Sequence, residues 1–115
     1  MRKNKSQEIN PFDSLDKFPG GTIVSKGLRD ISTGNFRSIE ALSVFTASPR
    51  LNWLGFSLNE NFFPFPHLLL YEKLKKKYSE NGYAQYNALM SRVAKFCNHY
   101  EGRKNKLQRR KPLND

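Results

Sequence analysis

The chain contains few of the side chains from which catalytic and metal sites are built. Its 115 residues include one cysteine and two histidines. The histidines, His67 and His99, are far apart in the sequence, and Cys97 lies about 200° from His99 around a helix, so we expect no shared metal ion. We therefore predict no metal, no cofactor and no catalytic residue, and we favour a non-enzymatic function.

Long apolar runs are also missing. No stretch approaches the ~20 apolar residues of a membrane span, and the longest candidate, around residues 62–71, is interrupted by Pro64 and Pro66. The basic residues 1–5 are not followed by an apolar segment, so we predict no secretory signal. Cys97 has no intramolecular disulfide partner and fits a core residue in a reducing compartment. We expect an intracellular protein, cytoplasmic or, in a eukaryotic cell or host, nuclear.

Positive charge, by contrast, is in excess. Twenty lysines and arginines stand against ten acidic residues, giving a net charge of +10. Residues 103–115 carry six basic residues and one acidic residue, and residues 1–8 carry three and one, so much of the excess lies at the two ends. This balance attracts phosphate backbones and acidic surfaces. The expected partner is therefore a nucleic acid or an acidic protein surface.

One periodic stretch, residues 83–101, organises the chain. Its apolar residues recur at spacings of three and four, which predicts a helix with a buried seam. Arg92, Lys95 and His99 project from roughly the opposite side of this helix. The predicted seam consists of Tyr83, Tyr86, Met90, Val93, Cys97 and Tyr100, widened by Leu89, Ala94 and Phe96.

Shorter helices are predicted ahead of it. Thr22, Ser38 and Ser48 are placed to cap three of them. Gly27 lies inside the first, where it either permits close helix packing or weakens the helix. Gly20-Gly21 before that helix resembles a phosphate-binding turn only weakly, because no strand precedes it and the Lys-Ser/Thr pair is missing. The predicted helices span 22–33, 39–47, 49–54 and 67–78, and a turn at 79–82 leads into the long one.

These elements predict an all-α protein. We expect a small bundle of about five helices in which the long C-terminal helix pairs antiparallel with the preceding one. Residues 1–8 form a disordered basic tail, residues 9–102 the single helical domain, and residues 103–115 a basic C-terminal tail. The tail is too polar to bury, although it can continue the helix on a charged partner.

Function is predicted from the basic residues of the last helix and the tail. If the helix continues through Gly102, one stripe within about 80° can follow a phosphate backbone, and it consists of Arg92, Lys95, His99, Arg103 and Lys106. Lys75, Lys76 and Lys77 would flank this stripe if they lie near the same end. The predicted phosphate contacts are Arg92, Lys95, Arg103, Lys104, Lys106, Arg109, Arg110 and Lys111.

Other interpretations remain open. The basic face can be a solvated surface with a solubilising tail, and residues 102–111 also fit a nuclear import signal. The aromatic cluster Phe62, Phe63 and Phe65, beside prolines, either closes the core or docks a partner protein. In the second case the chain is a protein-interaction module, such as an adaptor, an inhibitor or the partner-dependent member of a two-protein system. Trp53 is expected in the core.

Overall fold

Helices account for all the regular structure in residues 13–59 and 63–110, the parts of the chain that this computed structural model describes. Side chains are described from residue 14 to residue 106, except at 60–62. The all-α prediction is confirmed, while the tail predicted at 1–8 lies outside the described residues. The elements are η1 (Asp13–Lys17), α2 (Gly21–Ser32), α3 (Ile39–Thr46), α4 (Ser48–Trp53), α5 (Pro66–Tyr78), η2 (Ser79–Asn81) and α6 (Gly82–Arg110).

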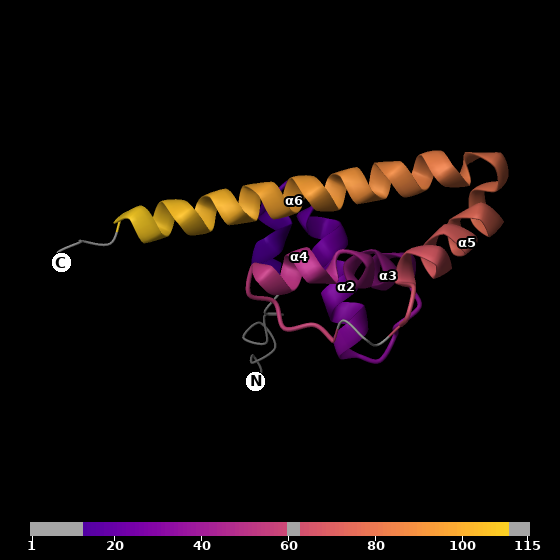
Figure 1. The fold of residues 1–115 in the computed structure, drawn as a ribbon, viewed down its shortest axis with the longest axis horizontal. Helices are drawn as coiled ribbons and strands as arrows, with labels where there is room; N and C mark the ends of the chain where they lie inside the picture. Colours follow the sequence, from indigo (N-terminus) through magenta and orange to yellow (C-terminus); the bar gives the residue numbers. More distant parts are fainter. Residues whose placement is uncertain (1–12, 60–62, 111–115) are drawn as a thin grey trace, which may run out of the picture.

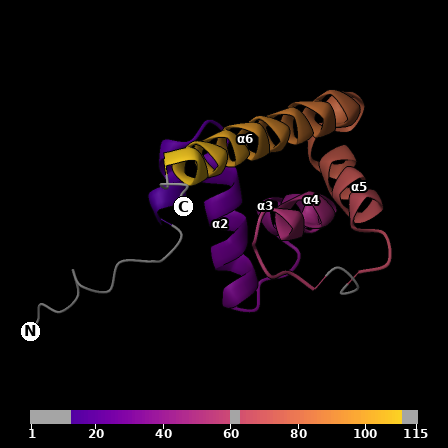
Figure 2. The ribbon, with the colours of Figure 1, turned by 60° about the vertical axis from the view of Figure 1, so that its left-hand side comes forward.

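The long helix α6 lies across one side of the other helices (Figures 1 and 2). It pairs with α5 through the short turn η2, as predicted, and the two helices diverge away from that turn. Its 29 residues correspond to about 43 Å at 1.5 Å per residue. The helix runs on to Arg110, so it covers part of the segment that we assign to the tail, and this end projects past the bundle (Figure 1).

The face of α6 that packs on the bundle is the one that the periodicity predicts, with a shifted centre. Val93 and Cys97 are 2% and 1% exposed, and Phe96, predicted only at the margin of the seam, is fully buried. Tyr83 was expected in the seam and is instead 63% exposed. This prediction was wrong because Tyr83 lies in the first turn of α6, where its ring packs only edge-on against Tyr71 of α5, at 6.3 Å between centroids.

Glycines set the approach of the elements that meet α2. Gly27 allows close packing on α3, because a Cβ atom there would stand 2.5 Å from the carbonyl oxygen of Glu40. Gly20 is the residue before α2 and adopts a left-handed conformation with φ 73°, so the predicted cap at Thr22 was wrong. A Cβ atom on Gly20 would overlap the carbonyl oxygen of Arg92 in α6. The backbone of the protein itself thus covers this turn, which speaks against a phosphate cradle there.

The junction of α2 and α3 is joined by a polar chain of contacts. The Ser38 hydroxyl accepts a hydrogen bond from the Ala41 amide at 3.0 Å, which confirms Ser38 as the cap of α3, and donates to Asp30 at 2.6 Å. Asp30 also pairs with Lys26 at 2.8 Å. Burial acts to raise the pKa of Asp30, but the hydrogen bonds from Lys26 and Ser38 outweigh it and leave the pKa below its usual value.

Helix α4 is short, and two predictions made for its sequence were wrong. Ser48 does not cap it, because Ser48 is its first residue and Ala47 precedes it without a side-chain cap. Trp53, predicted in the core, is 71% exposed. A helix of six residues offers few inward positions, and Leu51 and Leu54 take them, at 0% and 2% exposed. Trp53 is therefore left facing outward.

The core consists of two clusters of apolar side chains. The larger joins α2, α4 and α6 and includes Val24, Leu51 and Phe96. The smaller joins α3 to α5 through Leu42, Leu70 and Leu74. Cys97 belongs to the larger cluster, and burial raises the pKa of its thiol, which confirms the predicted core position.

Candidate functional site

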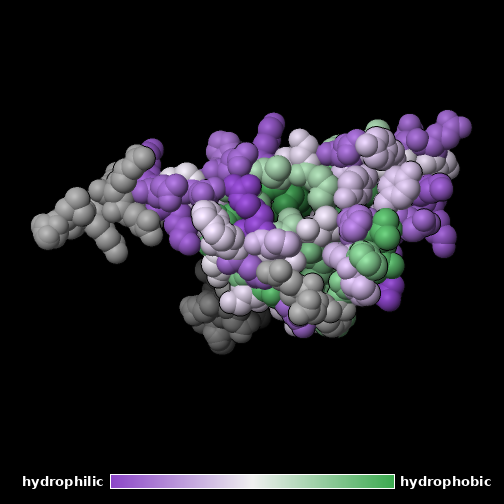
Figure 3. Space-filling model, in the orientation of Figure 1, coloured by the Kyte–Doolittle hydropathy of each residue, from purple (hydrophilic) through white to green (hydrophobic). Residues whose placement is uncertain are grey.

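The outward surface of α6 is cationic over its C-terminal part. The helix contains seven lysines and arginines and a single acidic residue, Glu101. Arg92, Lys95, Arg103 and Lys106 are exposed, and within the described residues none of them forms an ion pair. In Figure 3 hydrophilic side chains cover the described part of α6 next to its grey C-terminal end, whereas hydrophobic ones appear beneath the middle of the helix.

Two residues of α6 that neighbour this surface have structural partners instead. Lys104 donates a hydrogen bond to the carbonyl oxygen of Leu54 at 3.0 Å, at the C-terminal end of α4, where a cation complements the helix dipole. Glu101 pairs with Arg50 of α4 at 2.8 Å. Lys104 projects about 100° from Arg103 around the helix, so it does not lie within the stripe of the other predicted residues.

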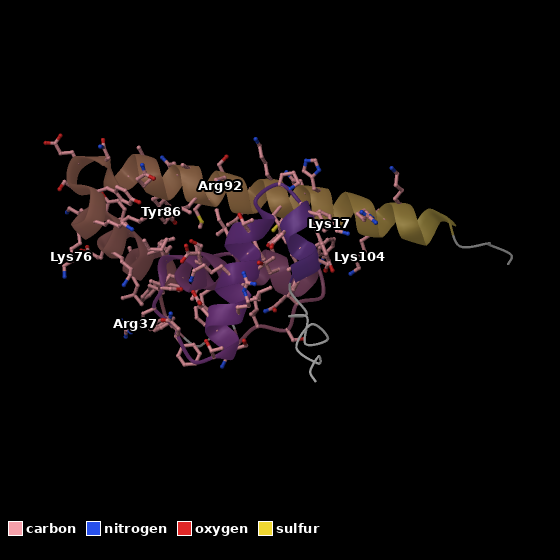
Figure 4. All side chains as sticks on the ribbon, turned by 180° about the vertical axis from the view of Figure 1, so that it is seen from behind. Lys17, Arg37, Lys76, Tyr86, Arg92 and Lys104 are labelled. Atoms are coloured by element: carbon pink, nitrogen blue, oxygen red, sulfur yellow. The ribbon has the colours of Figure 1, made fainter. Side chains whose placement is uncertain are left out.

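A cation from the beginning of the described chain joins the stripe. Lys17, the last residue of η1, lies beside the C-terminal half of α6 (Figure 4). Together they border a groove of about 530 Å³, and no acidic residue is among the described residues that line it. Asp16, the neighbour of Lys17, accepts a hydrogen bond from Ser25 at 2.7 Å. The groove, hereafter the basic groove, is lined by Lys17, Phe18, Pro19, Asn98, His99, Gly102, Arg103 and Lys106.

A second hollow opens next to the basic groove and has aromatic walls. Its volume is about 380 Å³, and Lys17, Phe18 and Arg103 line both spaces. The rings of Phe18 and Phe56 lie 5.5 Å and 5.1 Å from the ring of Tyr100, and all three side chains are half-buried. This hollow, hereafter the aromatic hollow, is lined by Ser14, Leu15, Lys17, Phe18, Phe56, Tyr100 and Arg103.

The residues that line the basic groove and the aromatic hollow are of types that can bind anions and flat rings. Ammonium and guanidinium groups without acidic partners attract phosphates, and half-buried rings offer surfaces for stacking. The described residues contain no group of three or more histidines, cysteines or carboxylates that could hold a metal ion. His99 in the basic groove has no carboxylate or nucleophile among the other residues that line the groove, so no acid–base pair is assembled there.

The lysines of α5 do not join the basic groove. Figure 4 places Lys76 and Arg37 at the end of the molecule opposite Lys17. There Arg37, Lys73 and Lys76 border a smaller hollow of about 210 Å³ that also contains Glu72. The sequence pattern left open whether Lys75, Lys76 and Lys77 flank the stripe on α6, and the fold separates them from it.

The aromatic cluster predicted as a docking surface is divided. Phe63 packs against the smaller core cluster, with its ring 5.4 Å from that of Phe45. Phe65 is 59% exposed, beside Leu68 at 53%, and hydrophobic surface is visible near the N-terminal end of α5 in Figure 3. Phe62 lies outside the described residues.

Sequence reasoning found one wall of the basic groove and missed the other. Arg103 and Lys106 were predicted from their positions on one helix, whereas Lys17 was not assigned to a site and Tyr100 was predicted only in the buried seam. The local signal at Lys17-Phe18-Pro19 was a basic and aromatic pair next to a turn, which gives no indication of a partner on α6. The side chains of Arg109 and Arg110, and all of Lys111, lie outside the described residues, so their predicted role stays a prediction.

No family model matches this chain, and no curated protein or solved structure is significantly similar to it. Among the described residues, no helix has both the length and the apolar surface needed to span a membrane.

Proposed function

We propose that this protein is a small, non-enzymatic nucleic-acid-binding protein that holds the phosphate backbone on α6 and in the basic groove. The observation that carries the proposal is the convergence of Lys17, Arg103 and Lys106 on a groove that has no acidic residue among its described lining residues. Arg92 and Lys95 extend the same side of the helix toward the middle of the bundle. In the other direction α6 continues to Arg110, and Arg109 and Arg110 stay predicted contacts.

Charge without ion pairs is the physical basis of this proposal. Keeping like charges together destabilises a folded chain, and a polyanion relieves that repulsion. Each phosphate neutralised by a lysine or arginine also releases a condensed counterion, which makes binding steeply dependent on salt. Lys104 is excluded from the proposed contacts, because its ammonium group already binds the end of α4.

The test is a charge reversal in the basic groove against a matched reversal elsewhere. The variant Arg103→Glu/Lys106→Glu is compared with Lys75→Glu/Lys77→Glu, two exposed lysines of α5 that do not line the groove. Both variants change the net charge equally. Binding of a fluorescent oligonucleotide is measured by anisotropy over a range of salt concentrations, with folding checked by circular dichroism.

The groove variant is expected to lose at least about tenfold in affinity, and the slope of log K against log[salt] should shrink by about 0.7 to 0.9 for each lost contact. The α5 variant should retain most of the affinity. Equal losses in the two variants would show attraction by net charge alone and would contradict a defined site. Failure of the unaltered protein to bind any oligonucleotide at low salt would remove the proposal.

The alternative of a protein-interaction module has less support. Its predicted surface depends on Phe62, Phe63 and Phe65 acting together, and Phe63 is partly buried against the core. Phe65 and Leu68 remain exposed, but two side chains form a small patch compared with typical protein interfaces. The nucleic-acid proposal draws on more residues, from both η1 and α6.

A further inference from the structure

The aromatic hollow adds a feature that phosphate binding alone does not require. A protein that only neutralises a backbone needs exposed cations on its surface. Here the cations Lys17 and Arg103 stand at the boundary between the basic groove and a space of about 380 Å³ with aromatic walls. That volume falls within the range of small-molecule sites in proteins, about 300 to 1,000 Å³.

The walls of the hollow are suited to a flat aromatic ligand. Tyr100 lies at the centre of an aromatic group, stacked on Phe96 with an interplanar angle of 21° and 5.5 Å between ring centroids. Phe18 meets Tyr100 edge-on, at 61°, which leaves an angled recess rather than a flat surface. Phe96 is fully buried and supports Tyr100 from the core side. The walls are therefore held in place before any ligand binds.

The two spaces match the two halves of a nucleotide. A phosphate in the basic groove would lie among Lys17, Arg103 and Lys106, and the base attached to it would enter the adjoining hollow. The bases of a duplex are paired and stacked inside the helix, so they do not reach such a recess, whereas an unpaired base can turn outward and stack on protein rings.

We infer that the ligand is a single-stranded nucleic acid, one base of which enters the aromatic hollow and packs beside Phe18, Phe56 and Tyr100 while its phosphate is held by Lys17 and Arg103. This inference rests on the proposed function and narrows it to unpaired strands. Stacking on rings tolerates any base, so binding is sequence-tolerant.

The first experiment varies the ligand and leaves the protein unaltered. Binding is compared for a single-stranded oligodeoxynucleotide, its duplex, and an abasic strand that keeps the sugar-phosphate backbone and its charge. We expect the abasic strand and the duplex to bind about tenfold or more weakly than the base-containing strand. Equal binding of the abasic strand would overturn base insertion and leave phosphate binding intact. No binding of any of the three would remove the proposed function as well.

The second experiment locates the base. A strand carrying a photoreactive 5-iodouracil is irradiated in the complex, and the crosslinked residue is identified by mass spectrometry. Crosslinks to Phe18, Phe56 or Tyr100 support the inference. Crosslinks confined to exposed rings elsewhere, such as Trp53 or Phe65, would overturn it.

A substitution gives an independent measurement. Tyr100→Leu keeps an apolar side chain and removes the ring. It should lower the affinity for the base-containing strand several-fold and change the affinity for the abasic strand little. Tyr71→Leu is the matched control, because Tyr71 also packs against two rings, Tyr83 and Tyr86, but on α5. Equal effects of Tyr100→Leu on both strands would contradict the inference. If the variant does not fold, the comparison of strands on the unaltered protein decides.

Discussion

The two halves of α6 are one continuous helix under different physical demands. Around Val93 and Phe96 the helix is buried, and it approaches the start of α2 so closely that only glycine fits at position 20. At its C-terminal end the same helix projects past the bundle, and at Gly102 nothing outside the helix lies within 4 Å of the position that a Cβ atom would take. Close packing therefore restricts which residues fit in the first half of α6. In the second half packing restricts the residues less, and most of the lysines and arginines of the helix lie there.

The largest expected effect is the loss of the central ring of the buried half. Phe96→Ala should lower the free energy of unfolding by about 3 to 5 kcal/mol, because a fully buried phenylalanine leaves both lost transfer energy and a cavity. Urea unfolding measures this change. Phe65→Ala is the control, since Phe65 is 59% exposed and its removal should cost less than about 0.5 kcal/mol. Similar losses in the two variants would mean that α6 is not anchored through Phe96.

A methyl group at Gly20 should have the next largest effect. Gly20→Ala combines a left-handed backbone with overlap against the Arg92 carbonyl, and we expect a loss of about 2 to 4 kcal/mol in unfolding free energy. Gly34→Ala separates the two causes, because Gly34 also has positive φ, at 90°, but nothing lies within 4 Å of its Cβ position. The difference between the two variants, from thermal or urea unfolding, measures the approach of α2 to α6. Equal losses would show that this approach is not tight.

A charged side chain with partners on the body of the protein should contribute to stability, unlike the cations without ion pairs on α6. Asp30→Ala removes the acceptor of Lys26 and Ser38 and should cost about 1 to 2 kcal/mol. Because the pKa of Asp30 is lowered in the fold, its contribution is present above the ordinary value of 3.8 and is lost as the pH falls below it. Urea unfolding at pH 7 and pH 3 should therefore show a smaller acid-induced loss in the variant. The exposed Glu80 in η2 supplies the control, Glu80→Ala, which should change stability little at either pH.

The smallest effect should be a gain. Gly102→Ala should stabilise the projecting part of α6 by up to about 1 kcal/mol, because alanine is the better helix former and the position is open. Helix content by circular dichroism should rise slightly. A loss of stability would mean that residue 102 is in close contact with the bundle, which would erase the difference between the two halves.

The sequence predicted the helices that carry their own local signals. The spacing of apolar residues located α6, Ser38 marked the start of α3, and the helix predicted at 67–78 matches α5 to within one residue. Trp53 and Tyr83 were misplaced because their exposure depends on which neighbours lie opposite them, and hydrophobicity does not contain that information. Local patterns also exaggerate the role of serine before a helix, as at Ser48.

Only one wall of the site was predicted from the sequence, for a related reason. Cations on one helix share a face by helical geometry, so Arg92, Lys95, Arg103 and Lys106 follow from spacing alone. Lys104 has the same charge but a different direction, and its partner, the carbonyl of Leu54, is fixed by packing between α4 and α6. Lys17 reaches the basic groove only because Gly20 lets the turn after η1 lie against α6.

One wall of the basic groove comes from the first described element and the other from the last. Protein synthesis runs from the N-terminus, so Lys17 is synthesised before His99, Arg103 and Lys106, which complete the groove. Polypeptides terminated before residue 98 therefore lack the second wall altogether.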